Sequence, residues 1–248
     1  MLEIKKLYKN FDGVQAVQDF SLKLEAGKVT SLIGPNGAGK TTVFNIVTGF
    51  LNASQGDVLY RGKKIHGRTP WQIARAGISR TFQNLRLFRK LTALENVLLG
   101  RQKQSGEQLL RALFTFSENS AEHRYNVEKA LEQLSFVGLQ DKRNDFAENL
   151  SYGQQKLLSI ACCLAAEPEA LMLDEPVSGV QPVMIEKIET IIHALIQQRK
   201  TVFLIEHDID FVLRISDTVV VMDDGCKIAE GTPSLIQSKP EILEAYLS

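Results

Sequence analysis

The sequence predicts an α/β protein that contains a phosphate-binding loop and an inserted helical segment. Three observations lead to this class. An apolar strand pattern runs into a glycine-rich loop that a helix follows, strand and helix patterns alternate toward the C-terminus, and a mostly helical stretch interrupts them from Asn84 to about Asn149. With 248 residues and 44% hydrophobic composition, the chain can bury a core as one large domain with an inserted lobe.

The part before the insert consists mainly of expected strands. Alternating or apolar patterns predict strands over 2–11, 16–27 and 28–34, and the last of these ends in the glycine loop. A helix is expected over 40–50. The segment 55–65 alternates and turns at Arg61-Gly62, which predicts a hairpin, and a short strand is expected within 77–83.

The insert and the remaining elements follow. Helical patterns cover 91–100 and 126–139, and a polar piece around 104–124 between them is expected to be mobile. A helix should begin at Ser151, because Ser151 and Gln154 have capping-box spacing before the apolar run "LLSIACCLAA". The later patterns predict a strand at 170–176, a helix at 182–199, strands at 201–208 and 217–225, and a hairpin return at 226–233.

These patterns give one domain over 1–248 with two parts. Residues 1–83 and about 150–248 are expected to form a catalytic core with a β subdomain. Residues of about 84–149, with the helix after them, are expected to form an inserted helical subdomain.

Composition and charge exclude several classes of protein. Lys+Arg and Asp+Glu both number 29, so no overall positive field favours nucleic acid, and we expect no nucleic-acid partner. No apolar run approaches the ~20 residues of a membrane helix, and "MLEIKKLYKN" lacks a signal-peptide core, which predicts a cytoplasmic protein. The three cysteines have no disulfide or metal-ligand spacing.

The glycine loop is the strongest local motif. It fits G-x-x-x-x-G-K-[ST] and lies between a strand and a helix, as the motif requires. Its backbone N–H groups can wrap phosphate oxygens, Lys40 can reach the β- and γ-phosphates, and Thr41 can supply a Mg²⁺ ligand. A glycine-rich helix cap without a ligand is the alternative, and the flanking elements disfavour it. The predicted nucleotide-binding residues of the loop are Gly34, Pro35, Asn36, Gly37, Ala38, Gly39, Lys40, Thr41 and Thr42.

Polar residues end three other expected strands. Asp174 and Glu175 close "ALMLDEP", where Asp174 suits a contact with Mg²⁺ and Glu175 could activate a water beside the γ-phosphate. Taken alone, the pair reads better as the acidic start of a helix before Pro176, and the phosphate loop reverses that preference. His207 ends "TVFLIEHD" and could bind the γ-phosphate or be merely structural, and Gln83 after "RTF" could simply face water.

With these motifs in this order, the chain resembles the ATP-binding subunits of ABC transporters over nearly its whole length. The resemblance implies the ABC ATPase fold of the P-loop NTPases: a RecA-like core, an antiparallel β subdomain and an inserted helical subdomain. "LSYGQ" resembles the signature motif. In the family this motif faces the γ-phosphate of ATP held by a second ATPase subunit, either an identical chain or a paralogue. The residues concerned are Ser151, Gly153 and Gln154.

The resemblance also assigns roles at the other motifs. It implies that Gln83 is the Q-loop glutamine, a catalytic residue and Mg²⁺ ligand, and that Asp174 is the Walker B aspartate, another Mg²⁺ ligand. It makes Glu175 the catalytic glutamate and His207 the switch histidine. Phe11 in "KNFDG" matches the aromatic residue that stacks on adenine. Tyr8 is the alternative for that role, and an ordinary core aromatic is the other interpretation of Phe11.

Two positions depart from the family pattern. Tyr152 replaces a signature glycine, while Ser151 and Gly153 keep the hydroxyl and the close backbone approach. Gln181 in "SGVQP" stands where the family commonly has an aspartate that couples the two sites of a dimer.

Longer stretches resemble one branch of the family. "RTFQNLRLFRKLTALENVLLG", the polar insert, "LSYGQQ" and "EGTPSLIQSKPEILEAYLS" together look like the ATPases of branched-chain amino acid importers, whose close relatives serve urea uptake. This resemblance implies membrane permease subunits docking near 84–100 and a peripheral place on the inner face of the cell membrane. From the residue pattern alone, a second interpretation of 84–100 is equally good: the segment contributes to the core of the lobe and has a solvated basic face.

Three other functions remain as alternatives. The ATPase of a lipopolysaccharide-type exporter is also similar in sequence. A soluble ABC ATPase of DNA repair or translation is disfavoured, because the chain has neither a long coiled-coil pattern nor a second ATPase unit. A regulator that binds nucleotide without hydrolysis is disfavoured by the presence of Glu175 and His207.

Overall fold

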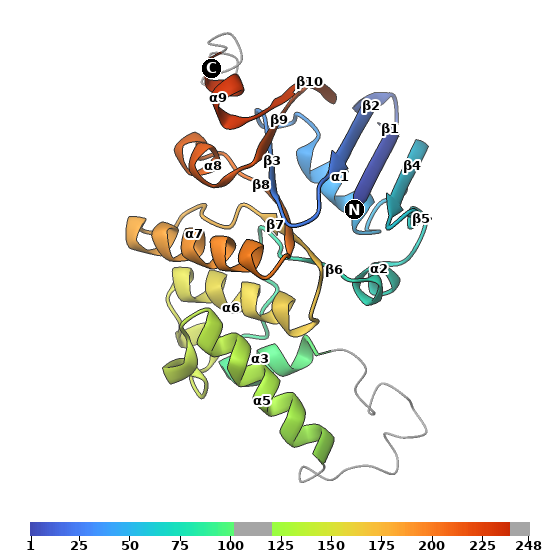
Figure 1. Ribbon diagram of the computed structural model, residues 1–248. Coiled ribbons are helices and arrows are strands. Elements are labelled where there is room, and N and C mark those ends of the chain that lie inside the picture. The colour runs from blue at the N-terminus through green and yellow to red at the C-terminus, as the bar shows by residue number, and fades with distance from the viewer. Residues whose placement is uncertain (102–120, 239–248) are drawn as a thin grey trace. The chain divides into compact units, whose positions relative to one another are not determined.

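The computed structural model describes residues 1–101 and 121–238, and these form two compact units (Figure 1). Unit 1 comprises Met1–Gln83 and the chain from Glu169 onward, and unit 2 comprises Asn84–Pro168. Most of the polar piece around 104–124, and the end of the C-terminal segment, lie outside the described residues. No helix in the described ranges has the length and apolar character needed to cross a membrane.

Unit 1 contains an antiparallel sheet in the order β2-β1-β4-β5. The strands are β1 (Leu2–Phe11), β2 (Val14–Leu24), β4 (Gln55–Tyr60) and β5 (Lys63–Lys64). Figure 1 shows β1, β2 and β4 side by side. Alternate residues Leu2, Ile4, Leu22 and Leu24 are buried, which is the period-two pattern of a sheet with one covered face. The predicted hairpin at Arg61-Gly62 is confirmed.

The second sheet of unit 1 has the order β10-β9-β3-β8-β7-β6 and is parallel except for β10. Every residue of β3, β7 and β8 is buried, which explains their continuous apolar runs. Parallel strands present their carboxyl ends at one edge, so the chain leaves β3, β7 and β8 on the same side of the sheet. Its strands are β3 (Val29–Ile33), β6 (Ile78–Arg80), β7 (Ala170–Asp174), β8 (Thr201–Ile205), β9 (Thr218–Asp223) and β10 (Cys226–Gly231).

In the part of unit 1 that the structure describes there are five helices, and sequence analysis missed three of them. They are α1 (Lys40–Val47), α2 (Pro70–Ala76), α7 (Pro182–Gln197), α8 (Ile209–Ile215) and α9 (Pro233–Gln237). Helix α2 carried readable signals, because Thr69 and Gln72 form a capping box, Pro70 opens the helix and Gly77 ends it. With five to seven residues each, α2, α8 and α9 are too short for a hydrophobic period to reveal them.

The described residues of unit 2 are mainly helical. They form α3 (Ala93–Leu99), α5 (Ala121–Phe136), α6 (Tyr152–Ala165) and the 3₁₀ turns η2 (Gln140–Lys142) and η3 (Ala147–Asn149). The predicted capping box of α6 is confirmed: Ser151 Oγ accepts from Gln154 N at 3.3 Å, and Gln154 Oε1 accepts from Ser151 N at 2.9 Å. The apolar faces of α3, α5 and α6 pack together in the core of unit 2. Its buried residues include Ala93, Val97, Ala130, Leu134, Leu157 and Ala161.

A buried ion pair joins three elements of unit 1. Arg80 Nη2 donates to Asp174 Oδ2 at 2.7 Å, and both side chains are at most 5% exposed. The other end of the guanidinium donates to Asn45 Oδ1 and Thr48 Oγ1 of the chain at α1. The guanidinium also lies against the rings of Phe44 and Phe82. Arg80 therefore links β6, β7 and α1 at the edge where those strands end.

We predict that Arg80→Met destabilises the protein by roughly 3–5 kcal/mol, because it leaves the Asp174 carboxylate buried without its cation. Arg75→Met on α2 is the matched control. Arg75 is exposed and lies over the Trp71 ring, so its loss should cost less than about 1 kcal/mol. Urea unfolding of both variants measures the difference, and equal losses would contradict a structural role for the ion pair.

Candidate functional site

The phosphate loop is shaped by close approaches to neighbouring strands. Gly34 has φ 155°, and a Cβ there would collide with the carbonyl oxygen of Met222 in β9. Gly39 has φ 94°, and a Cβ there would collide with the carbonyl oxygen of Ala16 in β2. Only glycine fits at these two positions, so the loop between β3 and α1 is locked against both sheets of unit 1.

The first turn of α1 follows this loop directly. Helix starts leave backbone N–H groups without intrahelical partners and carry a partial positive charge, so the residues from Lys40 onward present donors to an anion. Lys40 Nζ donates to the carbonyl oxygens of Gly34 at 2.6 Å and Pro35 at 2.8 Å. Burial lowers the pKa of Lys40, and the carboxylates of Glu175 and Asp174 oppose this shift.

Three predicted catalytic side chains meet at the carboxyl edge of the same sheet. His207 Nε2 lies 3.0 Å from Glu175 Oε1, and Gln83 Nε2 donates to Glu175 Oε2 at 2.9 Å. Each carboxylate oxygen of Glu175 thus has a hydrogen-bond partner. The backbone of Glu175 has φ 49°, an unusual value for a non-glycine residue, and its N–H donates to Ile205 O at 2.9 Å.

Asp174 lies beside Glu175 in a different environment. Its carboxylate pairs with Arg80, and its N–H donates to Thr81 Oγ1 at 3.0 Å. Thr41 is exposed at the start of α1. In the ranges 1–101 and 121–238, no group of three or more His, Cys, Asp or Glu residues could hold a metal. A metal site within these ranges would therefore need other donors, such as hydroxyl or amide oxygens, beside at most two residues of these types.

Sequence analysis missed two residues that contact this site. Arg80 belongs to a short strand pattern in which a charged residue is normally exposed. Glu206 lies between the strand β8 and His207, and its side chain accepts from Val177 N at 2.7 Å and from His207 N at 3.0 Å. A charged residue that interrupts an apolar run at a strand end is the only signal that could have found them.

A pocket of about 480 Å³ adjoins the phosphate loop in unit 1. It is lined by Asn10, Gly13, Val14, Gln15, Ala16, Gln18, Gly37, Asp224 and Gly225. Phe11, the predicted stacking residue, is the last residue of β1 and is not among the lining residues. The residue is 41% exposed, with Lys9 Nζ 4.7 Å from the ring centroid. Tyr8 is half-buried. Phe11 is therefore the more accessible aromatic face of the two.

The signature residues belong to unit 2, whereas the phosphate loop belongs to unit 1. Ser151 and Gln154 cap the start of α6, and Tyr152 is exposed with Lys156 Nζ 5.6 Å from its ring centroid. The tyrosine side chain is thus accommodated within the helix start. Gln181, the other departure from the family pattern, is the N-cap of α7 and makes no side-chain capping hydrogen bond.

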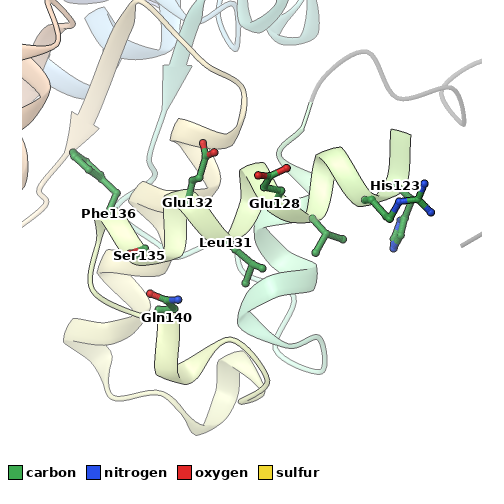
Figure 2. A pocket seen from close by; sticks show the side chains of 9 residues that line it. His123, Glu128, Leu131, Glu132, Ser135, Phe136 and Gln140 are labelled. Atoms are coloured by element: carbon green, nitrogen blue, oxygen red, sulfur yellow. The ribbon is translucent and has the colours of Figure 1, made fainter. Parts of the chain in front are cut away.

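A larger hollow of about 820 Å³ runs along α5 and η2 in unit 2 (Figure 2). Its lining includes His123, Glu128, Leu131, Glu132 and Phe136. None of the predicted site residues lines it, and Figure 2 shows its labelled side chains spread along α5, with Gln140 on η2, rather than converging on a point. It is therefore no part of the candidate site.

Comparison with known proteins identifies relatives along the whole chain. Residues 17–178 match the family described as ABC transporter. The chain is 42% identical to the high-affinity branched-chain amino acid transport ATP-binding protein BraF of Pseudomonas aeruginosa, and 40% identical to the corresponding protein LivG of Escherichia coli K12. Both alignments cover 100% of this chain and 97% of the relative.

Solved structures agree with this result. An ATP-binding cassette of an ABC transporter in its ADP conformation has a TM-score of 0.86 at 33% identity and covers 100% of this chain and 98% of that one. A dimeric post-hydrolysis cassette bound to ADP and Pi has a TM-score of 0.78 at 27% identity. The match covers 94% of this chain and 99% of that one. The ABC ATPase fold expected from the sequence is confirmed, and the chain belongs to the ABC transporter family.

Proposed function

We propose that this chain binds and hydrolyses ATP to power an ABC importer, with branched-chain amino acids or a related small polar solute as the cargo. The observation that carries the proposal is the position of Glu175, held between Gln83 and His207 at the sheet edge that also bears the phosphate loop. The cargo class rests on the names of BraF and LivG, which align with the entire chain.

The chain's own groups supply the parts of an ATPase. The loop from Gly34 to Thr42 offers backbone donors and the Lys40 ammonium to the phosphates. Glu175 acts as the base that orients and deprotonates the attacking water, and Gln83 and His207 hold its two oxygens. Phe11 is 41% exposed, and its ring offers a face for the adenine.

The donor set fits Mg²⁺. A threonine hydroxyl, a glutamine amide oxygen and one carboxylate are hard oxygen ligands, and Mg²⁺ bound with a nucleotide takes few protein ligands because phosphates and water complete its shell. Thr41, Gln83 and Asp174 would hold it. The bound ion would neutralise charge on the phosphates. Because Arg80 Nη2 donates a hydrogen bond to Asp174 Oδ2, the other carboxylate oxygen of Asp174 would be the one that binds the ion.

The proposal includes a dimeric assembly. We propose that two ATPase subunits, identical or paralogous, enclose ATP between the phosphate loop of one and Ser151, Gly153 and Gln154 of the other. The dimeric cassette bound to ADP and Pi supports this proposal. The capped start of α6 can offer its free N–H groups to a phosphate, and Gly153 adds no side chain there.

The segment 84–100 is the proposed docking site for permease subunits at the inner face of the membrane. Asn96, which is buried, fixes the loop before α3: its side chain accepts from Phe88 N and donates to the carbonyl oxygens of Phe88 and Leu91. Phe88 is 61% exposed on this hydrogen-bonded loop. Arg86 and Arg89 are exposed beside it. A fixed apolar residue flanked by cations suits a protein partner.

Glu175→Gln should still bind Mg·ATP but lose hydrolysis by at least about 100-fold, because it removes the base and spares the phosphate loop. ATP-bound dimer should accumulate. Glu186→Gln, an exposed carboxylate on α7, is the matched control and should hydrolyse normally. Phosphate release and size-exclusion chromatography with ATP measure both effects. Full hydrolysis by Glu175→Gln would exclude this role.

Lys40→Ala and Gly153→Asp should complement each other if the signature acts across the dimer. Each homodimer is expected to lose ATP retention, the first through lost phosphate contacts and the second through a repelling carboxylate. A mixed dimer keeps one site with an intact loop and an intact signature. With Glu175→Gln added to both chains, retained nucleotide should peak near equal mixing. No retention in heterodimers verified by tags would mean that the signature acts elsewhere.

Charge reversal at Arg86 and Arg89 should uncouple transport while sparing basal ATP hydrolysis, because both side chains lie in the proposed docking segment. Lys63→Glu with Arg68→Glu, two exposed cations of unit 1, is the control. Uptake by reconstituted complexes and hydrolysis by the isolated subunit are compared. Transport unchanged in the Arg86 and Arg89 variant would argue against docking there.

A further inference from the structure

Glu206 is a buried acid for which the proposed reaction has no use. Its side chain follows the last residue of β8, and the residue is 1% exposed. Its two oxygens have different partners: Oε1 accepts from the backbone N–H of Val177 at 2.7 Å, and Oε2 accepts from the backbone N–H of His207 at 3.0 Å. One carboxylate thus binds two chain segments that are far apart in the sequence.

These two segments carry the proposed base and its histidine partner. Val177 lies two residues beyond Glu175, and His207 follows Glu206 directly. The paired register of β7 and β8 ends at Asp174 and Ile205. Past this point one backbone hydrogen bond, from Glu175 N to Ile205 O, continues the pairing, and the Glu206 carboxylate extends it to Val177.

A connection of this kind is needed at Glu175. Its backbone has φ 49°, and a non-glycine residue keeps such a conformation only where the surroundings hold it. The Glu175 carboxylate must also stay 3.0 Å from His207 Nε2, although the two residues leave different strands. The Glu206 carboxylate holds the backbone at Val177 and at His207, and this limits the movement of both Glu175 and His207.

The chemistry of the position calls for a carboxylate. Two N–H donors point at one buried side chain, and an ionised carboxylate offers acceptors at both oxygens and no donor. Burial raises the pKa of Glu206 above its ordinary value, and the backbone N–H groups of Val177, His207 and Asp208 oppose this shift, because their hydrogen bonds favour the ionised form. An apolar residue would pack at lower cost but would leave both donors unsatisfied.

We propose that Glu206 is a positioning residue for ATP hydrolysis, whose carboxylate ties the segment after Glu175 to His207 and so keeps the Glu175–His207 pair in register. This inference rests on the proposed function. Glu206 touches neither nucleotide nor the attacking water in this role. It acts through the backbone of Val177 and His207, whose N–H groups it accepts from.

The test uses an isosteric substitution. Glu206→Gln keeps the shape but has one oxygen, so its amide N–H must face one of the two N–H donors. Glu206→Asp keeps two acceptors on a shorter side chain. In the full chain, kcat for ATP hydrolysis should fall at least about tenfold in Glu206→Gln, with KM for ATP and the affinity for a fluorescent ATP analogue changed less than about twofold. Glu206→Asp should recover part of the lost kcat.

Asp208→Asn is the matched control, because it makes the same carboxylate-to-amide change two residues away. Asp208 Oδ1 caps α8 by accepting from Phe211 N, and asparagine caps helices equally well, so kcat should stay within about twofold of wild type. Melting temperatures of all variants are measured, and kcat is compared well below the lowest of them.

A double-mutant cycle with His207→Ala decides whether Glu206 acts through its neighbour. Once the histidine ring is absent, adding Glu206→Gln should reduce kcat by less than about threefold. Full kcat in Glu206→Gln, independent losses in the cycle, or ATP affinity falling in parallel with kcat would each overturn the inference. A wild-type chain that fails to hydrolyse ATP would instead overturn the proposed function.

Discussion

Parallel pairing of β3, β8 and β7 is the constraint on which the rest of unit 1 depends. The three strands pair residue for residue, with Leu32 opposite Ile205 and Ile205 opposite Asp174, so all three end at the same level. The phosphate loop, the acidic pair and Glu206-His207 therefore leave the sheet at one edge. A shift of one residue in the pairing of β7 would turn each side chain, including that of Asp174, to the other face of the sheet. It would thereby separate Asp174 and Glu175 from their partners.

Polar groups just beyond these strands make the edge rigid. Arg80 fixes Asp174 to α1, and Glu206 connects the segments that carry Glu175 and His207. Both side chains are charged and buried, and such groups are tolerated only with well-placed partners. Asp174 is distant from Arg80 in the sequence. Val177 is likewise distant from Glu206, whose other partner, His207, is its direct neighbour. The site is thus held by interactions between segments rather than by local turns.

The sequence allowed the local features to be predicted and left the distant ones open. A motif such as the loop from Gly34 to Thr41 has a short, fixed spacing, and the start of α6 is marked by the spacing of Ser151 and Gln154, so both could be predicted. Arg80 and Glu206 could not, because their burial depends on which strands pair. The resemblance to ABC ATPases supplied the roles of Gln83 and His207, while the hydrogen bonds to Glu175 come from the structure.

The central claim is that the phosphate loop and Glu175 act on the same ATP molecule. A structure of the dimer with Mg²⁺ and a non-hydrolysable ATP analogue tests it most directly. We expect the triphosphate in the loop from Gly34 to Thr42, with one water hydrogen-bonded to Glu175 and in line with the γ-phosphate. An analogue bound away from the loop, or a Glu175 carboxylate too far to share a water with the γ-phosphate, would contradict it.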